Sequence, residues 1–186
     1  MWRFMVQFQN KNGFTLIEFI LGITLISMLI LTIFSIFTFV DSSVKISEEN
    51  NDIFLNGQYG LEYIKNEILI SDKIISSSKF SDLNKDFPTN IGFVLMVRNK
   101  NKLKFITYYI ENNNLVRIAC EVDKYIYPNS VNFKGFNQIC TNLSSFTGTN
   151  IDLKNKILHL KINMVNNQTS SLNFKSTILL RPDIEF

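Results

Sequence analysis

Residues 11–18 read Lys11-Asn12-Gly13-Phe14-Thr15-Leu16-Ile17-Glu18, and the apolar stretch that follows them reaches Val40. Between Phe14 and Val40 the only charged residue is Glu18, and there is no proline. A helix of this length spans about 40 Å, which exceeds the roughly 30 Å of hydrocarbon in a bilayer. The stretch is therefore predicted to cross a membrane. Its carboxylate is a functional candidate, because an ionisable group in lipid is costly unless it is paired.

The leader that precedes this stretch differs from an ordinary secretory signal. Residues 1–12 contain Arg3 and Lys11 but no acidic residue, which predicts that the leader stays in the cytoplasm. A secretory signal places its apolar region before the cut and loses it on processing. Here the small residue Gly13 comes before the apolar region, so a cut at Gly13 would keep the helix in the mature chain.

The hexapeptide from Gly13 to Glu18 resembles, at all six positions, the class III signal of type IV pilin-like proteins. This family includes pilins, the pseudopilins of type II secretion and the competence pseudopilins. The resemblance implies that a prepilin peptidase cuts between Gly13 and Phe14, that Phe14 becomes an N-methylated N-terminus, and that Glu18 acts in assembly. It also implies a head outside the cytoplasmic membrane and later a filament of the cell envelope or surface. The implied partners are other pilin or pseudopilin subunits, a membrane platform protein driven by a cytoplasmic ATPase, and membrane lipid.

Elementary electrostatics suggests a role for Glu18. Cleavage would leave a positive amine on Phe14, which can lie beside the Glu18 carboxylate of another subunit in a staggered bundle. At about 4 Å and an effective dielectric near 20, such a pair attracts by roughly 4 kcal/mol. We expect this pairing to favour assembly and to set the axial register. The alternative is a Glu18 that stays protonated or reaches the interface and has no function.

The same helix has a row of hydroxyl side chains within about 80° of one another, formed by Thr24, Ser27, Ser35 and Thr38. Such residues let membrane helices approach closely and bond across the contact. Equally, their hydroxyls can bond back to carbonyls of their own helix.

The remaining chain predicts an α+β fold, with a long N-terminal helix packed on an antiparallel β-sheet head. Residues 14–40 are expected to form the membrane half of that helix and residues 41–78 an amphipathic continuation, with Gly57 and Gly60 as the place for a bend or a break. The apolar face of the continuation contains Phe54, Leu61, Ile64, Ile68 and Ile75. Residues 79–186 are predicted to form the head. Its predicted strands are Ile91–Val97, Leu103–Ile110, Leu115–Ala119, Lys156–Val165 and Ser171–Leu180, with residues 80–89 as a loop and 120–150 irregular.

The hairpin formed by Leu103–Ile110 and Leu115–Arg117 resembles the J-type minor pseudopilins and the W-type minor pilins, as does the closing strand into Leu180-Arg181. This second resemblance favours a minor pilin or pseudopilin. Many Gram-negative major pilins have a disulfide close to the C-terminus, whereas the cysteines here are Cys120 and Cys140. That departure also disfavours a major pilin.

Cys120 and Cys140 would lie outside the cytoplasmic membrane. A disulfide between them would close a loop of about 20 residues, worth about 3 kcal/mol in the chain-entropy model. The alternative is two buried thiols. With His159 as the only histidine, their spacing does not predict a zinc site. Strand alternation predicts His159 at the surface, on the same side as Lys161.

The charge balance does not indicate a dedicated DNA-binding surface. The formal net charge is +3, of which Arg3 and Lys11 supply two. The basic runs Arg98–Lys104 and Lys154–Lys156 read most simply as turns between strands, although DNA contact through them, as in a competence pseudopilin, is an alternative function. A second alternative is an uncleaved single-pass membrane protein with an extracytoplasmic sensor domain. No catalytic motif stands out, and we expect neither enzymatic activity nor a cofactor or metal.

Overall fold

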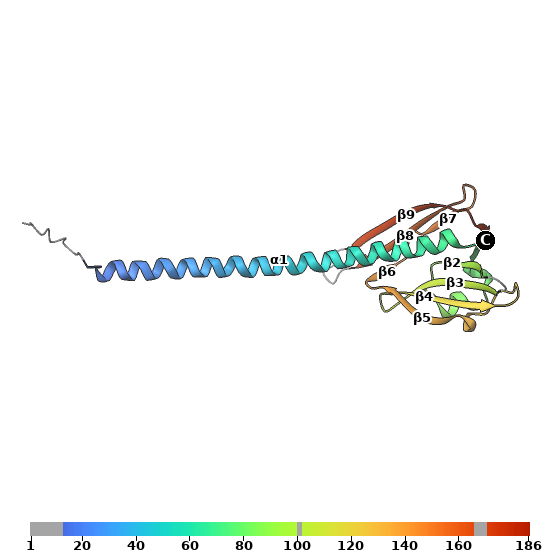
Figure 1. The fold of residues 1–186 in the computed structure, drawn as a ribbon, viewed down its shortest axis with the longest axis horizontal. Coiled ribbons are helices and arrows are strands. Elements are labelled where there is room, and N and C mark those ends of the chain that lie inside the picture. Colours follow the sequence, from blue (N-terminus) through green and yellow to red (C-terminus); the bar gives the residue numbers. More distant parts are fainter. Residues whose placement is uncertain (1–12, 100–101, 166–170) are drawn as a thin grey trace, which may run out of the picture. The chain divides into compact units, whose positions relative to one another are not determined.

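A computed structural model of the chain describes residues 13–99, 102–165 and 171–186. Contacts divide the chain into two compact units, Met1–Ser47 and Glu48–Phe186. The helix α1 (Leu16–Ile70) contributes to both, and all the strands belong to the second (Figure 1). The predicted α+β class, with a long N-terminal helix followed by a β-sheet head, is confirmed.

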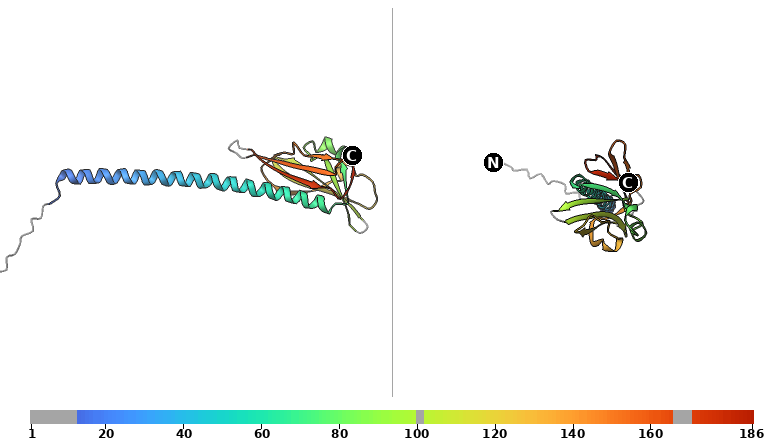
Figure 2. Two further views of the ribbon diagram at one scale, coloured as in Figure 1. Left: turned by 90° about the horizontal axis from the view of Figure 1, so that it is seen from above. Right: turned by 90° about the vertical axis from the view of Figure 1, so that its right-hand side faces the viewer.

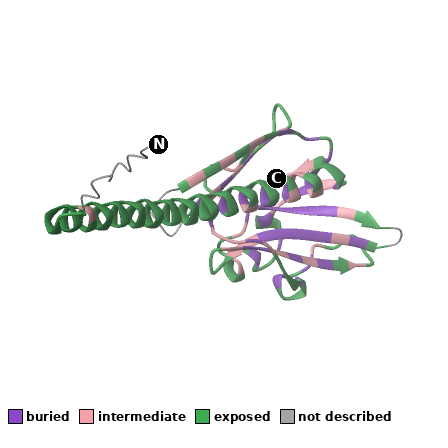
Figure 3. Ribbon diagram, turned by 60° about the vertical axis from the view of Figure 1, so that its left-hand side comes forward, coloured by how far each residue is buried: buried purple, intermediate pink, exposed green. Residues whose placement is uncertain are grey.

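The first unit consists of the N-terminal part of α1. From Phe14 to Ser47 every residue is exposed except the half-exposed Gly22, as Figure 3 shows for this part of the helix. Its most apolar window has a mean hydropathy of 2.6, so the helix is long and apolar enough to cross a membrane. The hydroxyls of the predicted row bond back to carbonyls of their own helix, for example Thr24 to Leu21 and Ser35 to Leu31. The second interpretation of that row therefore describes the single chain.

The second unit contains two β-sheets. Sheet A has the order β10-β1-β2-β3-β4-β5. In sheet B, β6 and β7 pair with one edge of the central strand β8, and β9 pairs with the other edge. Besides β1 (Lys73–Ser76), the strands of sheet A are β2 (Phe93–Asn99), β3 (Lys102–Glu111), β4 (Asn114–Val122), β5 (Lys134–Cys140) and β10 (Asp183–Glu185). Sheet B is made of β6 (Leu143–Ser145), β7 (Asn150–Asp152), β8 (Ile157–Val165) and β9 (Ser171–Leu179).

Residues 53–68 of α1 form the centre of the main core. Their buried side chains pack in one cluster with Phe93, Ile106 and Leu115 of sheet A and with Leu158 and Ile162 of sheet B. Figures 1 and 2 show the two sheets on different sides of this helical segment. A second cluster covers the other face of sheet A with residues of the segments 75–83 and 120–133. Sheet A is thus buried on both faces, whereas sheet B is buried on one.

Both predicted hairpins are present. In the first hairpin, β3 and β4 pair from Leu103 opposite Val122 to Glu111 opposite Asn114. In the turn between them, Asn112 and Asn113 adopt positive φ angles of 49° and 61°. Two residues with positive φ give the turn whose twist matches that of a hairpin. In the second hairpin, β8 and β9 pair over their whole length, and the predicted turn at residues 166–169 lies outside the described residues.

Three predictions about elements are wrong. The helix ends at Ile70, not near residue 78, because the buried Ser71 caps it by donating its hydroxyl to the Ile68 carbonyl, after which the chain enters β1. Residues 120–150 are not irregular, since they contain β5, β6 and β7. The head is also not wholly antiparallel, because β10 pairs with β1 in parallel.

The helix is not broken at Gly57 and Gly60, because both lie inside the uninterrupted helix α1. A Cβ at Gly57 would lie 2.3 Å from Phe174 Cε2 of β9, and a Cβ at Gly60 would lie 2.7 Å from Cys140 Sγ of β5. The two glycines therefore let the helix approach both sheets closely.

Between the first strand and the second, the predicted loop at residues 80–89 contains a short helix, α2 (Leu83–Asp86). It follows a short 3₁₀ helix at Ser77–Lys79, and its Leu83 side chain is completely buried. This segment helps to cover the outer face of sheet A. A further 3₁₀ turn, at Ser130–Asn132, precedes β5.

Candidate functional site

The N-terminus of α1 holds the Glu18 carboxylate in a reciprocal capping arrangement. The Thr15 backbone N–H and the Thr15 hydroxyl both donate to Glu18 Oε2, each over 2.9 Å. In return, the Glu18 backbone N–H donates to Thr15 Oγ1 over 3.4 Å. This is the capping box of a helix N-terminus, and such caps are typically worth about 1 kcal/mol. The Thr-Leu-Ile-Glu spacing of the motif therefore starts the helix as well as placing the carboxylate.

The surface beside Glu18 is hollow. Gly22 lies one helical turn further on, and nothing lies within 4 Å of the position that a Cβ would occupy there. Phe14, Glu18, Gly22 and Ile26 line a hollow of about 230 Å³ together with Phe19 and Ile23. Among the described residues that line this open hollow, Glu18 alone is charged, and a positive group of another molecule can approach its carboxylate there.

The remaining residues of the predicted cleavage motif are accessible. Gly13 precedes the helix and is exposed, and Phe14 is 87% exposed. The bond between them therefore lies outside the helix, between two exposed residues. The structure thus brings Gly13, Phe14 and Glu18 together at one helix end.

The predicted disulfide between Cys120 and Cys140 is not formed, and both residues are buried free thiols. Cys140 packs in the core beneath α1, whereas Cys120 packs in the cluster on the other face of sheet A. Because Cys140 pairs with Leu115 at one end of β4 and Cys120 lies near its other end, a bond between them would require the sheet to rearrange. The alternative of two buried thiols is therefore the one observed.

The sequence interpretation missed a partly buried ion pair between α1 and sheet A. Arg117 Nε donates to both oxygens of Glu67 over 3.0 Å, and its Nη2 lies 2.9 Å from Glu67 Oε1. The hydroxyl of the fully buried Tyr108 also donates to Glu67. Burial raises the pKa of Tyr108, and the Glu67 carboxylate raises it further, so the phenol keeps its proton. No local motif marks this site, because its residues come from three separate elements.

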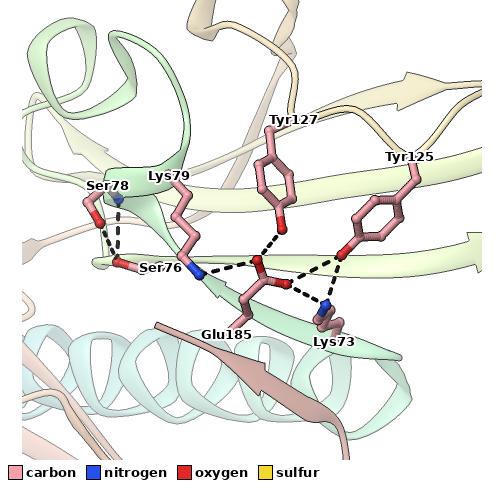
Figure 4. A network of polar contacts seen from close by, with 7 residues as sticks. All are labelled: Lys73, Ser76, Ser78, Lys79, Tyr125, Tyr127 and Glu185. Atoms are coloured by element: carbon pink, nitrogen blue, oxygen red, sulfur yellow. Dashed lines mark hydrogen bonds and ion pairs between the residues drawn. The ribbon is translucent and has the colours of Figure 1, made fainter.

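A second missed group of polar residues surrounds Glu185 of β10 (Figure 4). The Glu185 carboxylate accepts hydrogen bonds from the Tyr127 hydroxyl and from Lys79 Nζ, and it forms an ion pair with Lys73. These donors, Lys73 first, lower the pKa of Glu185 to about 2. Lys73 also lies over the ring of Tyr125, 5.4 Å from its centroid. The network attaches the last strand to β1 and to the loop after β4.

The basic runs and His159 have ordinary local partners. Lys104 forms an ion pair with Glu121 on the next strand, and part of the Arg98–Lys104 run, at residues 100–101, lies outside the described residues. The Lys154–Lys156 run forms the turn between β7 and β8, as predicted. His159 is exposed and its Nδ1 lies 3.3 Å from the Thr177 hydroxyl, which confirms its predicted position on the outer face. In the part of the chain that the structure describes, no three His, Cys, Asp or Glu side chains are grouped to hold a metal ion.

Comparisons with protein-family models, with curated proteins and with solved structures found no match. The structure is compatible with single-pass membrane anchoring by α1, with a soluble β-sheet head.

Proposed function

We propose that the chain is a subunit of a type IV pilin-like filament, in the group of minor pilins and pseudopilins. In this proposal a prepilin peptidase removes residues 1–13, and the mature chain is assembled through the N-terminal part of α1. The head, made of residues 48–186, is displayed outside the cytoplasmic membrane.

The observation that carries the proposal is the Glu18 carboxylate in the exposed and otherwise uncharged segment 14–40 of α1, one turn from the predicted new N-terminus. The helix offers Glu18 only Thr15 as a partner, through neutral donors. A positive amine on Phe14 of a neighbouring subunit would supply the missing counter-charge. Since neither charge is stable alone in lipid, their pairing would favour the assembled state.

The first experiment is the N-terminal mass of the protein extracted from its host membrane. We expect a chain that begins at Phe14, with or without an added methyl group. Replacing Gly13 with leucine should block this cleavage, whereas the matched replacement Gly22→Leu should not. A mature chain that still carries residues 1–13 would contradict the proposal and would favour the uncleaved single-pass protein.

The second experiment tests Glu18. We expect Glu18→Ala to leave cleavage and membrane insertion unchanged but to reduce co-purification with partner subunits. The attraction of roughly 4 kcal/mol expected for the pair would be lost. Glu62→Ala is the matched control, since it removes an exposed carboxylate from the same helix. Normal co-purification of the Glu18 variant would contradict the assigned role.

A further inference from the structure

Sheet B has an outer face on which positive charges lie together. Residues 143–179 contain Lys154, Lys156, Lys161 and Lys175 but only one acid, Asp152. Lys161 on β8 lies directly opposite Lys175 on β9, and His159 lies two residues before Lys161 on β8. We name Lys161, Lys175 and His159 the basic face.

The two lysines of the basic face have no ion-pair partner among the described residues. Neither lysine forms an ion pair, although the described residues include every acidic residue of the sequence. Asp152 lies on β7 close enough to His159 to interact with it electrostatically, and it accepts hydrogen bonds from Lys154 and Asn155 of its own turn, but it forms no ion pair with Lys161 or Lys175. Like charges directly opposite on neighbouring strands are destabilising. The pair at Lys161 and Lys175 therefore does not serve the stability of the single chain.

These side chains border a hollow of about 270 Å³, which Asn150 and Thr177 also line. Its rim consists of cationic groups and hydrogen-bond donors, without an exposed carboxylate. A surface of this chemistry fits carboxylates of another molecule.

A matching set of negative charges lies on α1. Glu48, Glu49 and Asp52 are all exposed, fall within about 100° of one another on the helix, and form no ion pair among the described residues. We name these three residues the acidic turn. Lys45, the nearest lysine along the helix, pairs with Asp41 instead.

The two surfaces also match in spacing. Side chains at i and i+4 on a helix, such as Glu48 and Asp52, have Cβ atoms about 5–6 Å apart. Residues directly opposite on antiparallel strands, such as Lys161 and Lys175, have Cβ atoms about 4.5–5.5 Å apart. Two carboxylates of the acidic turn can therefore face two ammonium groups of the basic face at the same time.

Within one chain the two surfaces cannot meet. Phe174 of β9 points inward and packs against Gly57 and Phe54 of α1. Its neighbour Lys175 points to the other side of the sheet, because side chains alternate along a strand. The helix lies on the inner side of sheet B, so its acidic turn does not reach the outer face.

We propose that the basic face of one copy of this chain binds the acidic turn of a second copy. The two surfaces are different and do not overlap, so the contact is heterologous and can repeat from copy to copy. This inference rests on the proposed function, since it names a contact between subunits of the filament. It implies that copies of the chain adjoin one another, even where the subunit has low abundance.

Charge exchange in the full-length, processed protein tests the proposal. We expect Lys161→Glu with Lys175→Glu to reduce self-association of the detergent-extracted chain roughly tenfold, and Glu48→Lys with Asp52→Lys to do the same. Combining all four changes should restore association to within about threefold of the unchanged protein. Lys85→Glu is the matched control, since Lys85 is exposed outside the basic face. Association should also weaken as salt is added.

Cross-linking gives a second, geometric readout. Chains with Asp52→Cys and chains with Lys175→Cys should form disulfide-linked dimers only when the two populations are mixed. Each population alone should form no disulfide-linked dimer, because a heterologous contact brings different surfaces together and each chain carries a new cysteine on only one of them. Dimers of the Asp52→Cys chain alone would overturn the proposal.

The outcomes separate this inference from the function on which it rests. If the chain is cleaved at Gly13 and depends on Glu18 for assembly, but charge exchange restores nothing, the contact is wrong and the filament proposal stands. If cleavage is absent, the filament proposal itself fails. A third outcome is that the lysine variants lose salt-dependent retention on immobilised DNA, and that the variant with all four substitutions does not recover self-association. In that case the basic face binds a polyanion and the proposal is overturned.

Discussion

Replacing Glu67 with glutamine tests whether its ion pair with Arg117 holds α1 on sheet A. The side chains of Arg117 and Glu67 are only 11% and 15% exposed, so water compensates poorly for a lost partner. Breaking a buried pair by removing one charge costs about 3–5 kcal/mol, and we place this partly hydrated pair at about 2–4 kcal/mol. Glutamine also offers one acceptor oxygen where the carboxylate offers two, so Arg117 and Tyr108 would compete for it.

A double variant separates the ion pair from the packing of the two side chains. Glu67→Leu with Arg117→Met replaces both charges by apolar groups of similar volume. We expect its free energy of unfolding to lie within about 1–2 kcal/mol of that of the unchanged protein. The loss of the hydrogen bond from Tyr108 accounts for this difference. Each single variant should cost more than the double variant.

The measurement is urea unfolding of the full chain in detergent, followed by the fluorescence of the tyrosines in the head. Glu62→Gln is the matched control, because Glu62 pairs with Lys65 at the surface, where the side chains are 48% and 34% exposed. That variant should change the free energy of unfolding by less than about 0.5 kcal/mol. A Glu67→Gln variant as stable as this control, or a double variant that costs the sum of its parts, would refute the reasoning.

Three further predictions concern the head. Gly57→Ala would place a Cβ 2.3 Å from Phe174. We expect this overpacking to lower the free energy of unfolding by about 1–3 kcal/mol, although alanine has the better helix propensity. An unfolding curve unchanged from the parent would contradict this. Burial raises the pKa of Cys140 to about 12 and also raises that of Cys120. Iodoacetamide at pH 8 should therefore modify Cys140 only as fast as the head unfolds, which mass spectrometry can follow. Rapid modification of the folded protein would show that the thiol is accessible. The pKa of Glu185 is lowered to about 2 from 4.5, so the contribution of this carboxylate to stability is complete above pH 4.5 and is lost as the pH falls towards 2. Hydrogen exchange at β10 should accelerate over that pH range. The acceleration should be smaller in the Glu185→Gln variant.

The parts of the fold that local sequence determines were predictable. β8 and β9 alternate in burial, β3 and β4 are apolar runs on either side of a turn, and adjacent asparagines make that turn, so both hairpins follow from neighbouring residues. The helix end did not follow, because Ile75 continues the apolar spacing of Ile68 although it serves a strand. The edge strand β5 is exposed from Lys134 to Gln138 and thus carries no apolar alternation.

The candidate site divides in the same way. Gly13, Phe14, Thr15 and Glu18 lie within one turn, and their spacing predicts both the helix start and the placement of the carboxylate. By contrast, the meaning of Gly57 depends on Phe174, which is remote in the sequence, so a glycine that permits close packing was interpreted as a bend. The partners of Glu67 are similarly remote and only the tertiary structure reveals them.

The distribution of unmatched groups supports two separable kinds of contact. Among the described residues, every buried side-chain nitrogen and oxygen has a hydrogen-bond partner, so the polar chemistry of the interior is complete within the chain. What lacks a partner is the apolar surface of residues 14–40, with Glu18 in it, and the two charged surfaces of the second unit. Lipid or other helices can cover the first, whereas an oppositely charged surface, in competition with dissolved salt, can neutralise the other two. Because the two kinds of surface share no residue, loss of Glu18 and charge reversal on the basic face should impair assembly independently, and their effects on its free energy should add.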